Sequence, residues 1–460
     1  MPNLPFLSAA DGAAVPIHAI RTGEWKQWDE RHPESLRRLA KAHDFQAQNA
    51  RILLVPATDG SIERVLFGVG DKATVNVMGA LAQHLPAGDY RIATAPREFN
   101  TTGVAIAWGL GAYAFERYKK RKRPAPRLAP PDGADMAEAE RIIEASWLAR
   151  DLVNTPTNDM GPDALHAAAE KVARDNGAEF EAVVGAALLE QNYPLIHAVG
   201  RASAQAPRIV RIGWGDPAAP RVALVGKGVT FDTGGLDIKP SAGMRMMKKD
   251  MGGAAHALAL GQLIMQSKLN VRLDVFLAIV ENAISGDAFR PGDIIASRKG
   301  PTVEIDNTDA EGRLILADAL ARASEDQPAL LIDFATLTGA ARTALGPDIP
   351  PFYTGDEALA SELAAASLET NDPVWRMPLW DPYEAEMDSP IADLKNTGDG
   401  AMAGSIYGAL FLRRFVSVLC WAHFDVFAWS PKEKPSRPQG GDAQALRAVY
   451  RVIKGRFGQS

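Results

Sequence analysis

Residues 221–235 read RVALVGKGVTFDTGG, an apolar run that passes directly into a glycine-rich segment. The run from Arg221 to Gly226 is typical of a strand buried on both faces. Lys227 and Asp232 would then follow the end of that strand. Ligands of open α/β sheets bind outside the carboxyl ends of the strands, so we expect a functional site here.

The chain around this segment alternates between predicted strands and helices. An apolar helix is expected over 252–267 and another helix over 314–325. The expected strands are 271–280 (VRLDVFLAIV), 329–335 (ALLIDFA) and 421–427 (WAHFDVF). Alternation of this kind, with continuous apolar strands, predicts a largely parallel sheet covered by helices on both faces.

The first 123 residues predict a separate, smaller α/β block. Short strands are expected at 51–56, 64–68 and 89–95, and a helix at 71–84. A basic and proline-rich seam follows, with an amphipathic helix over 134–153. The predicted fold class is therefore α/β. It comprises a small N-terminal α/β domain (1–123), a linker and connecting helix (124–150), and a larger α/β domain (151–460) with a central mixed, largely parallel sheet flanked by helices.

Composition excludes several classes of protein. The 460 residues carry a net charge of −6, which gives no general attraction to nucleic acid. A single cysteine, Cys420, permits neither an intrachain disulfide nor a multi-cysteine zinc site. No apolar run is long enough to span a membrane, and the N-terminus lacks the pattern of a secretory signal. We therefore expect a cytoplasmic protein that does not associate with membranes.

Four carboxylates lie in the glycine-rich segments that follow predicted strands or precede a predicted helix: Asp232, Asp250, Asp309 and Glu311. If they converge, they cannot all stay ionised without nearby cations. Two divalent metal ions would balance four negative charges, and two-metal sites are a known solution for hydrolases. The alternative is that each acid only caps a helix or forms a turn.

Other catalytic motifs fit poorly. The segment Gly226-Lys227-Gly228 begins like a dinucleotide fingerprint but lacks the third glycine. The sequence contains no Walker A run, no H-E-x-x-H pair and no G-x-S-x-G elbow.

Several motifs, in order along the chain, closely resemble those of the leucyl (cytosol) aminopeptidases, a family of two-metal exopeptidases. The most specific is NTDAEGRL at 307–314, and the resemblance extends over about residues 135–430. The others are LVNTPTN at 152–158, GKGVTFDTGG at 226–235, IKPSAGM at 238–244, KDMGGAA at 249–255, DFATLTGA at 333–340 and ADLKNTG at 392–398. This resemblance makes residues 151–460 the expected catalytic metallo-aminopeptidase domain.

The resemblance implies a role for each matching residue. Asp232 and Glu311 would contact both metal ions, Lys227 and Asp250 would complete one metal site, and Asp309 would complete the other. Lys239 would stabilise the negative oxygen that forms on the substrate. Arg313 would hold a bicarbonate ion that acts as general base. Thr336, Leu337 and Gly339 would position the peptide unit of the substrate.

The resemblance also implies cofactors and partners. Two divalent ions per subunit are expected, zinc or manganese, with magnesium able to occupy the more exchangeable site. Peptides with N-terminal leucine or another hydrophobic residue are the expected substrates, and a homohexamer is the expected assembly. Asp237, where many relatives have serine, is expected to tune the pKa of Lys239.

Two other functions remain open at this stage. A two-metal phosphoesterase or another amidohydrolase could use the same carboxylates. A nucleic-acid-binding regulator that retains the peptidase site could use the basic run Lys119–Arg123, although nucleic acid is not an expected partner.

Overall fold

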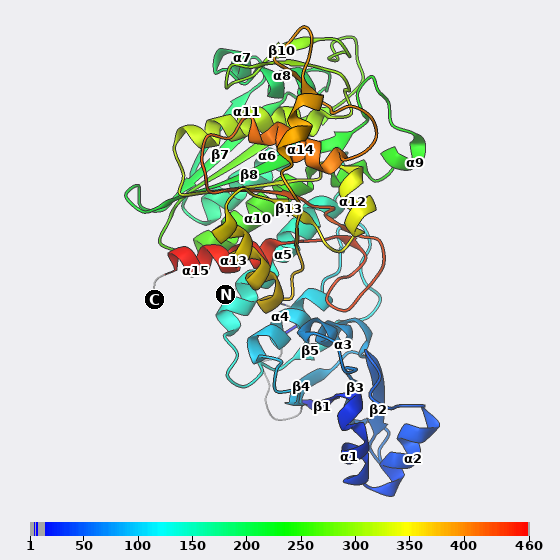
Figure 1. The fold of residues 1–460 in the computed structure, drawn as a ribbon. Helices are drawn as coiled ribbons and strands as arrows, with labels where there is room; N and C mark the ends of the chain where they lie inside the picture. The colour runs from blue at the N-terminus through cyan, green and yellow to red at the C-terminus, as the bar shows by residue number, and fades with distance from the viewer. Residues whose placement is uncertain (1–3, 5, 8–13, 459–460) are drawn as a thin grey trace. The chain divides into compact units, whose positions relative to one another are not determined.

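The computed structural model describes residue 4, residues 6–7 and residues 14–458, and the chain folds into two compact units (Figure 1). One unit comprises Met1–Trp147 together with Lys432–Gln439, and the other comprises Leu148–Pro431 together with Gly440–Ser460. One boundary between the units falls inside helix α5 (Met136–Asn154). The domain division at residues 123 and 150 stays a prediction.

The first unit is built on a five-stranded sheet in the order β2-β3-β1-β4-β5. β2 is antiparallel to β3, and the remaining neighbours are parallel. Its strands are β1 (Val15–Ile20), β2 (Arg51–Pro56), β3 (Ile62–Gly68), β4 (Asp89–Thr94) and β5 (Arg127–Leu128). Its other helices are α1 (Trp25–Glu30), α2 (Glu34–Ala42), α3 (Gly79–His84) and α4 (Thr101–Gly111).

The second unit is built on an eight-stranded sheet in the order β14-β13-β16-β12-β8-β9-β7-β6. The four central strands β16, β12, β8 and β9 are all parallel, and β7 and β6 continue the sheet antiparallel. The strands are β6 (Glu179–Val184), β7 (Arg208–Trp214), β8 (Arg221–Asp232), β9 (Arg272–Asn282), β12 (Leu330–Ala335), β13 (Pro351–Tyr353), β14 (Trp375–Arg376) and β16 (Trp421–Asp425). This is the predicted mixed, largely parallel sheet.

Helices cover both faces of the central strands (Figure 1). Helices α8, α11 and α14 lie on one face, and α6, α10, α13 and α15 lie on the other. Their bounds are α6 (Pro162–Asp175), α8 (Pro194–Gly200), α10 (Gly252–Gln266), α11 (Glu311–Glu325), α13 (Glu357–Glu369), α14 (Gly404–Arg413) and α15 (Leu446–Phe457). The arrangement confirms the predicted α/β fold class.

Shorter elements complete this unit. A three-stranded sheet joins β10 (Ile294–Ala296), β11 (Thr302–Glu304) and β15 (Leu394–Lys395), and β17 (Trp429–Ser430) pairs with β18 (Gly440–Gly441). The short helices are α7 (Ala187–Glu190), α9 (Ser241–Met244) and α12 (Gly339–Leu345). The described residues contain no helix that is both long and apolar enough to cross a bilayer.

The central strand β8 is longer than the sequence predicts. Expected to end at Gly226, it continues to Asp232, so Lys227 lies inside the strand and not in a turn after it. Glycines in this region, which could have indicated a turn, allow the helix α10 and the sheet to pack closely. A Cβ atom on Gly226 would lie 2.5 Å from the Ala254 Cα of α10, and one on Gly253 would lie 2.1 Å from the Phe334 carbonyl oxygen of β12. Glycine therefore lets α10 approach the sheet closely.

The helix expected over 71–84 is also shorter than predicted. Residues Val75–Met78 form a 3₁₀ helix, and the α-helix begins only at Gly79. Val75 and Val77 are β-branched, which lowers helix propensity at this position.

Candidate metal centre

The charged residues singled out from the sequence meet at the carboxyl end of β8. Lys227 lies within β8, and Asp232 is its last residue. Asp250 belongs to the 3₁₀ helix Met247–Met251, and Glu311 begins α11. The parallel topology therefore brings together side chains that lie more than eighty residues apart in the chain.

Lys227 bridges two of the acids. Its Nζ lies 2.7 Å from Asp250 Oδ2 and 2.9 Å from Glu311 Oε1, and it donates a hydrogen bond of 3.0 Å to the Thr336 carbonyl oxygen. Burial alone would lower the pKa of Lys227, but the surrounding carboxylates raise it above its ordinary value. Without a metal ion, the surrounding carboxylates therefore favour the protonated form of Lys227.

Lys239 makes a second bridge. Its Nζ lies 2.8 Å from Asp232 Oδ2 and also contacts Asp309 Oδ1. Burial would lower the pKa of Lys239, but Asp232 and Glu311 raise it above its ordinary value. Asp237, expected to act on Lys239, is engaged elsewhere. Its Oδ2 accepts hydrogen bonds from the backbone N–H and the hydroxyl of Thr308. That contact ties the Asp237 loop to the Asp309 loop.

The acids exceed what these two lysines can satisfy. Asp232, Asp309 and Glu311 each place one oxygen within 4.8 Å of the others. Glu311 Oε2 is buried and has no hydrogen-bond partner among the described residues. Burial, followed by the charge of Asp232, raises the pKa of Glu311 to about 8 and that of Asp309 to about 6.

This donor set fits divalent metal ions. Two oxygens on opposite sides of an ion at roughly 2.1 Å lie about 4.2 Å apart, so the 4.8 Å cluster needs only a small adjustment to hold one. Cations would also satisfy the unpartnered oxygen of Glu311. Asp232 is already oriented for this task, because its Oδ1 accepts hydrogen bonds from Gly234 N (2.8 Å) and Asn282 Nδ2 (2.9 Å).

Arg313 lies in the first turn of α11 and lines the same cavity. Its Nη1 donates a hydrogen bond of 2.7 Å to the Asn396 carbonyl oxygen, whereas its Nε is buried without a partner among the described residues. Burial lowers the pKa of Arg313 to about 10. The unpartnered Nε leaves this guanidinium able to bind a further acceptor.

The segment after β12 forms another wall of the cavity. Thr336 donates a hydrogen bond of 2.8 Å from its hydroxyl to Asp250 Oδ1, which links this wall to the acidic cluster. Leu337 N donates to Asp425 Oδ1 at 3.0 Å, and Gly339 is the first residue of α12. All three residues predicted to position a substrate therefore line one cavity.

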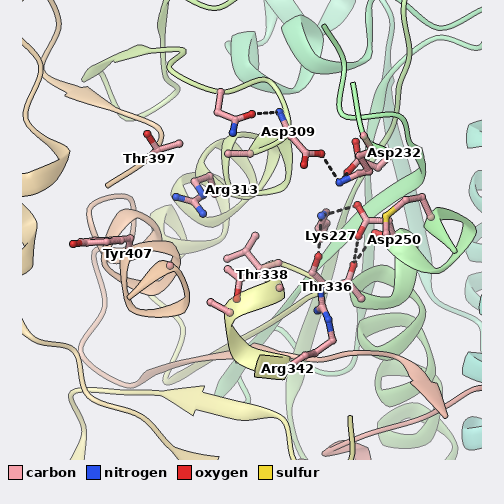
Figure 2. A pocket seen from close by; sticks show the side chains of 18 of the residues that line it. Lys227, Asp232, Asp250, Asp309, Arg313, Thr336, Thr338, Arg342, Thr397 and Tyr407 are labelled. Carbon is pink, nitrogen blue, oxygen red and sulfur yellow. Dashed lines mark hydrogen bonds and ion pairs between the residues drawn. The ribbon is translucent and has the colours of Figure 1, made fainter. Parts of the chain in front are cut away.

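The cavity has a volume of about 290 Å³ (Figure 2). It is near the lower end of the range for small-molecule pockets, about 300–1,000 Å³, which suits the end of a peptide. Figure 2 shows Asp232, Asp250 and Lys227 close together on one side of it, with Arg313 and Tyr407 farther across.

Several residues of the site had no signal in the sequence. Asn396 lies in the stretch 392–398, but nothing there indicates that its side chain accepts hydrogen bonds from the backbone N–H groups of Asp306 and Asn307. Asp425 ends β16 and holds the loop of Leu337. Lys249 and Arg342 line the cavity without belonging to the acidic cluster. Position at the carboxyl end of a strand is the signal that could have identified Asp425.

Comparison with protein families gives two matches that together cover most of the chain. Residues 147–450 match the cytosol aminopeptidase family, catalytic domain, and residues 15–131 match the M17 aminopeptidase, N-terminal domain. A probable cytosol aminopeptidase of Xanthobacter autotrophicus is 40% identical over 370 residues, covering 77% of this chain and 74% of its own. One of Methylobacterium radiotolerans is 37% identical over 452 residues, covering 91% and 89%.

Solved structures agree. The cytosol aminopeptidase from Coxiella burnetii is 42% identical and superposes with a TM-score of 0.93, covering 98% of this chain and 99% of its own. The bottromycin maturation enzyme BotP in complex with Mn is 32% identical with a TM-score of 0.87, covering 97% and 100%.

Proposed function

This chain belongs to the cytosol aminopeptidase family, and from that premise we propose that it removes N-terminal residues from peptides with the help of two divalent metal ions. The observation that carries the proposal is the cluster of Asp232, Asp309 and Glu311, in which Asp232 and Glu311 are buried and Glu311 Oε2 has no hydrogen-bond partner among the described residues. A buried carboxylate oxygen without a partner is costly, and a metal ion would satisfy it.

The chain's own residues divide the work of holding the metals. Asp232 and Glu311 would contact both ions, Lys227 and Asp250 would complete one site, and Asp309 would complete the other. Lys227 must lose its proton to act as a ligand, and a nearby dication favours the neutral amine. When bound, the two ions supply Lewis acidity and lower the pKa of water toward neutrality.

Lys239 has the opposite task and must keep its proton. Its high pKa and its place between Asp232 and Asp309 support a role as donor to the substrate oxygen that gains negative charge. Arg313, whose buried Nε has no hydrogen-bond partner among the described residues, would bind a bicarbonate ion, and that ion would act as the general base. Thr336, Leu337 and Gly339 would align the peptide unit against these groups.

Finer features of the function are supported by similarity alone. Leucine or another hydrophobic N-terminal residue is the family-based expectation for the substrate. Zinc or manganese is the expected ion, and magnesium could serve in the more exchangeable site. The Mn complex of BotP supports manganese. We also propose a cytoplasmic homohexamer, and the name cytosol aminopeptidase, shared by the relatives, supports the compartment.

The experiment is chelation followed by readdition of a single metal. The protein is stripped with a chelator and assayed on leucyl-p-nitroanilide with zinc, manganese, magnesium or buffer. Restoration by at least one metal, with no turnover of a model phosphodiester, supports an aminopeptidase over a phosphoesterase. A folded, metal-loaded protein that hydrolyses no aminoacyl substrate would contradict the proposal.

A further inference from the structure

The cavity has a second group of charges that the proposed mechanism does not use. Lys249 and Arg342 both line it, and both lie against the same aromatic ring. Lys249 Nζ is 5.5 Å from the centroid of Phe427, and Arg342 Cζ is 4.9 Å from that centroid. Figure 2 draws Arg342 below Thr336, on the side of the cavity away from Asp309.

Lys249 is buried but weakly paired. Only 2% of the residue is exposed. Its one ion pair within the described part of the chain is to Asp250 Oδ1, at the long distance of 3.7 Å. That oxygen already accepts a hydrogen bond from the Thr336 hydroxyl, and Asp250 Oδ2 lies 2.7 Å from Lys227 Nζ. The Lys249 ammonium therefore has no acid of its own.

Arg342 is equally short of partners. It extends from α12, and its Nη1 is buried with no hydrogen-bond partner among the described residues. Asp425 also lies in this part of the unit, but it is engaged elsewhere. Its Oδ1 accepts hydrogen bonds from the backbone N–H groups of Leu337 and Thr338, and its Oδ2 accepts one from the Thr338 hydroxyl.

The charges that line the cavity are thus unevenly distributed. The acids Asp232, Asp250 and Asp309 belong to the predicted metal cluster at one side. Lys249 and Arg342 line the cavity next to this cluster, beyond Asp250, and each raises the electrostatic cost of the other's charge. Two cations that share one ring, Lys249 buried and Arg342 half-buried, and that have no hydrogen-bonded anion among the described residues make a site complementary to a carboxylate.

We propose that Lys249 and Arg342 bind the side-chain carboxylate of a substrate whose N-terminal residue is glutamate or aspartate. The inference rests on the proposed function, because it takes the α-amine and the first carbonyl group to lie at the metal cluster. Lys249 Nζ is 3.7 Å from an oxygen of that cluster, within reach of the first side chain. The carboxyl terminus of the peptide lies beyond the scissile bond and is farther away. Leucine shares the aliphatic stem of these side chains and can enter the same space.

The experiment compares isosteric substrates on the metal-loaded protein. The ratio of kcat/KM for glutamyl- over glutaminyl-p-nitroanilide is measured beside leucyl-p-nitroanilide. A charge-assisted hydrogen bond predicts a ratio of about 10-fold to 100-fold in favour of glutamate. Lys249→Met and Arg342→Met should each lower the ratio about 10-fold, and the double variant should bring it near unity.

Lys248→Met is the matched control. Lys248 lies in the same 3₁₀ helix, but its Nζ donates to the Asn154 carbonyl oxygen and it does not line the cavity. Its removal should leave the ratio unchanged. Because the readout is a ratio, a general loss of folding or of metal lowers both rates and does not imitate the effect.

Calorimetric binding of the free amino acids gives a second readout. L-glutamate should bind more tightly than L-glutamine, and Arg342→Met should remove the difference. Equal kcat/KM values for the two substrates would overturn the inference and leave the aminopeptidase function standing. If none of the three substrates is hydrolysed, the proposed function itself fails.

Discussion

At the amino ends of β8 and β9, Asp274 is fully buried, and both of its oxygens accept hydrogen bonds from arginines. Arg211 Nε and Nη2 donate to Oδ1 at 3.0 and 2.6 Å, and Arg221 donates to Oδ2. At the carboxyl end of β8, Glu311 is equally buried, yet its Oε2 has no partner among the described residues. One end of the sheet thus has a buried acid that is satisfied by the protein, and at the other end the first residue of α11 is a buried acid that is not.

The difference separates stability from function. A buried carboxylate held by two arginines needs nothing from outside the protein, so it can serve the fold alone. A buried carboxylate among other carboxylates destabilises the chain, and Lys227 and Lys239 leave Glu311 Oε2 without a hydrogen bond, so a further cation would stabilise the cluster. The carboxyl end of the sheet therefore has the features of a binding site, and the amino end has those of a structural ion pair.

Replacing Glu311 should give the largest effect on activity. Glu311→Gln removes one charge and one metal ligand, so we expect kcat/KM for leucyl-p-nitroanilide to fall by about 10³-fold or more. In the presence of a chelator the variant should be at least as stable as the wild type, because a buried carboxyl group beside other carboxylates, with one oxygen lacking a hydrogen bond, has been replaced by a neutral amide. Thermal unfolding in the chelator checks this, and a large loss of stability would show that Glu311 serves the fold.

Asp274→Asn should have the reverse profile. Breaking a buried ion pair costs about 3–5 kcal/mol, so the variant should unfold at a lower temperature while its kcat per folded molecule stays unchanged. Glu179→Gln is the matched control, because Glu179 pairs with Arg211 and Arg272 from an exposed position. It should change stability by less than about 1 kcal/mol. Activity loss in Asp274→Asn at full folding would undermine the comparison.

Lys239→Met tests the division of labour among the lysines. Losing a donor to a developing negative charge typically lowers kcat by about 10²–10³-fold. Because Lys239 is not assigned as a metal ligand, metal binding should be retained, as measured by calorimetry with manganese. A variant that loses metal as well as turnover would place Lys239 in the metal shell.

Asp318 is a third buried acid, with more hydrogen bonds than Glu311 but without the two arginines that hold Asp274. It is fully buried on α11 and accepts hydrogen bonds from the backbone N–H groups of Leu195, Ile196 and Arg298. Burial raises its pKa to about 7, against the opposing effect of these hydrogen bonds. The folded chain then binds a proton more tightly than the unfolded chain. The stability that this proton contributes is fully present below about pH 4 and is lost as the pH rises through 7.

Asp318→Asn resembles the protonated acid at every pH. The variant and the wild type should therefore have similar unfolding midpoints near pH 4, and the wild type should become progressively less stable than the variant between about pH 4 and pH 7, by a few kcal/mol, with little further change above pH 7. Thermal unfolding across pH 4–8 measures this difference. A wild type that gains stability over the variant with rising pH would mean that the backbone hydrogen bonds outweigh burial.

Several strands of the two main sheets could be predicted because they are continuous apolar runs. β2 has the predicted bounds, and β9, β12 and β16 lie within two residues of theirs at each end. The prediction failed where local composition and tertiary packing disagree. Gly226 looks like a turn residue but lies inside β8, because only a residue without a side chain fits against Ala254.

The acidic cluster was also accessible from the sequence, since its members follow strands or begin a helix. The pair of cations formed by Lys249 and Arg342 could not be predicted from the sequence. These two residues lie in segments far apart in the chain. The sequence of neither segment indicates that both side chains would reach Phe427. Such a pair depends on which face of a short helix meets which loop, and residue spacing does not contain that information.

The most direct measurement is the number of metal ions bound per chain. The wild type and Glu311→Gln are dialysed against manganese or zinc, washed, and analysed by elemental mass spectrometry beside Asp274→Asn. We expect two ions per chain in the wild type and in Asp274→Asn, and fewer than one in Glu311→Gln. A wild type without bound metal, or equal metal content in all three proteins, would contradict this expectation.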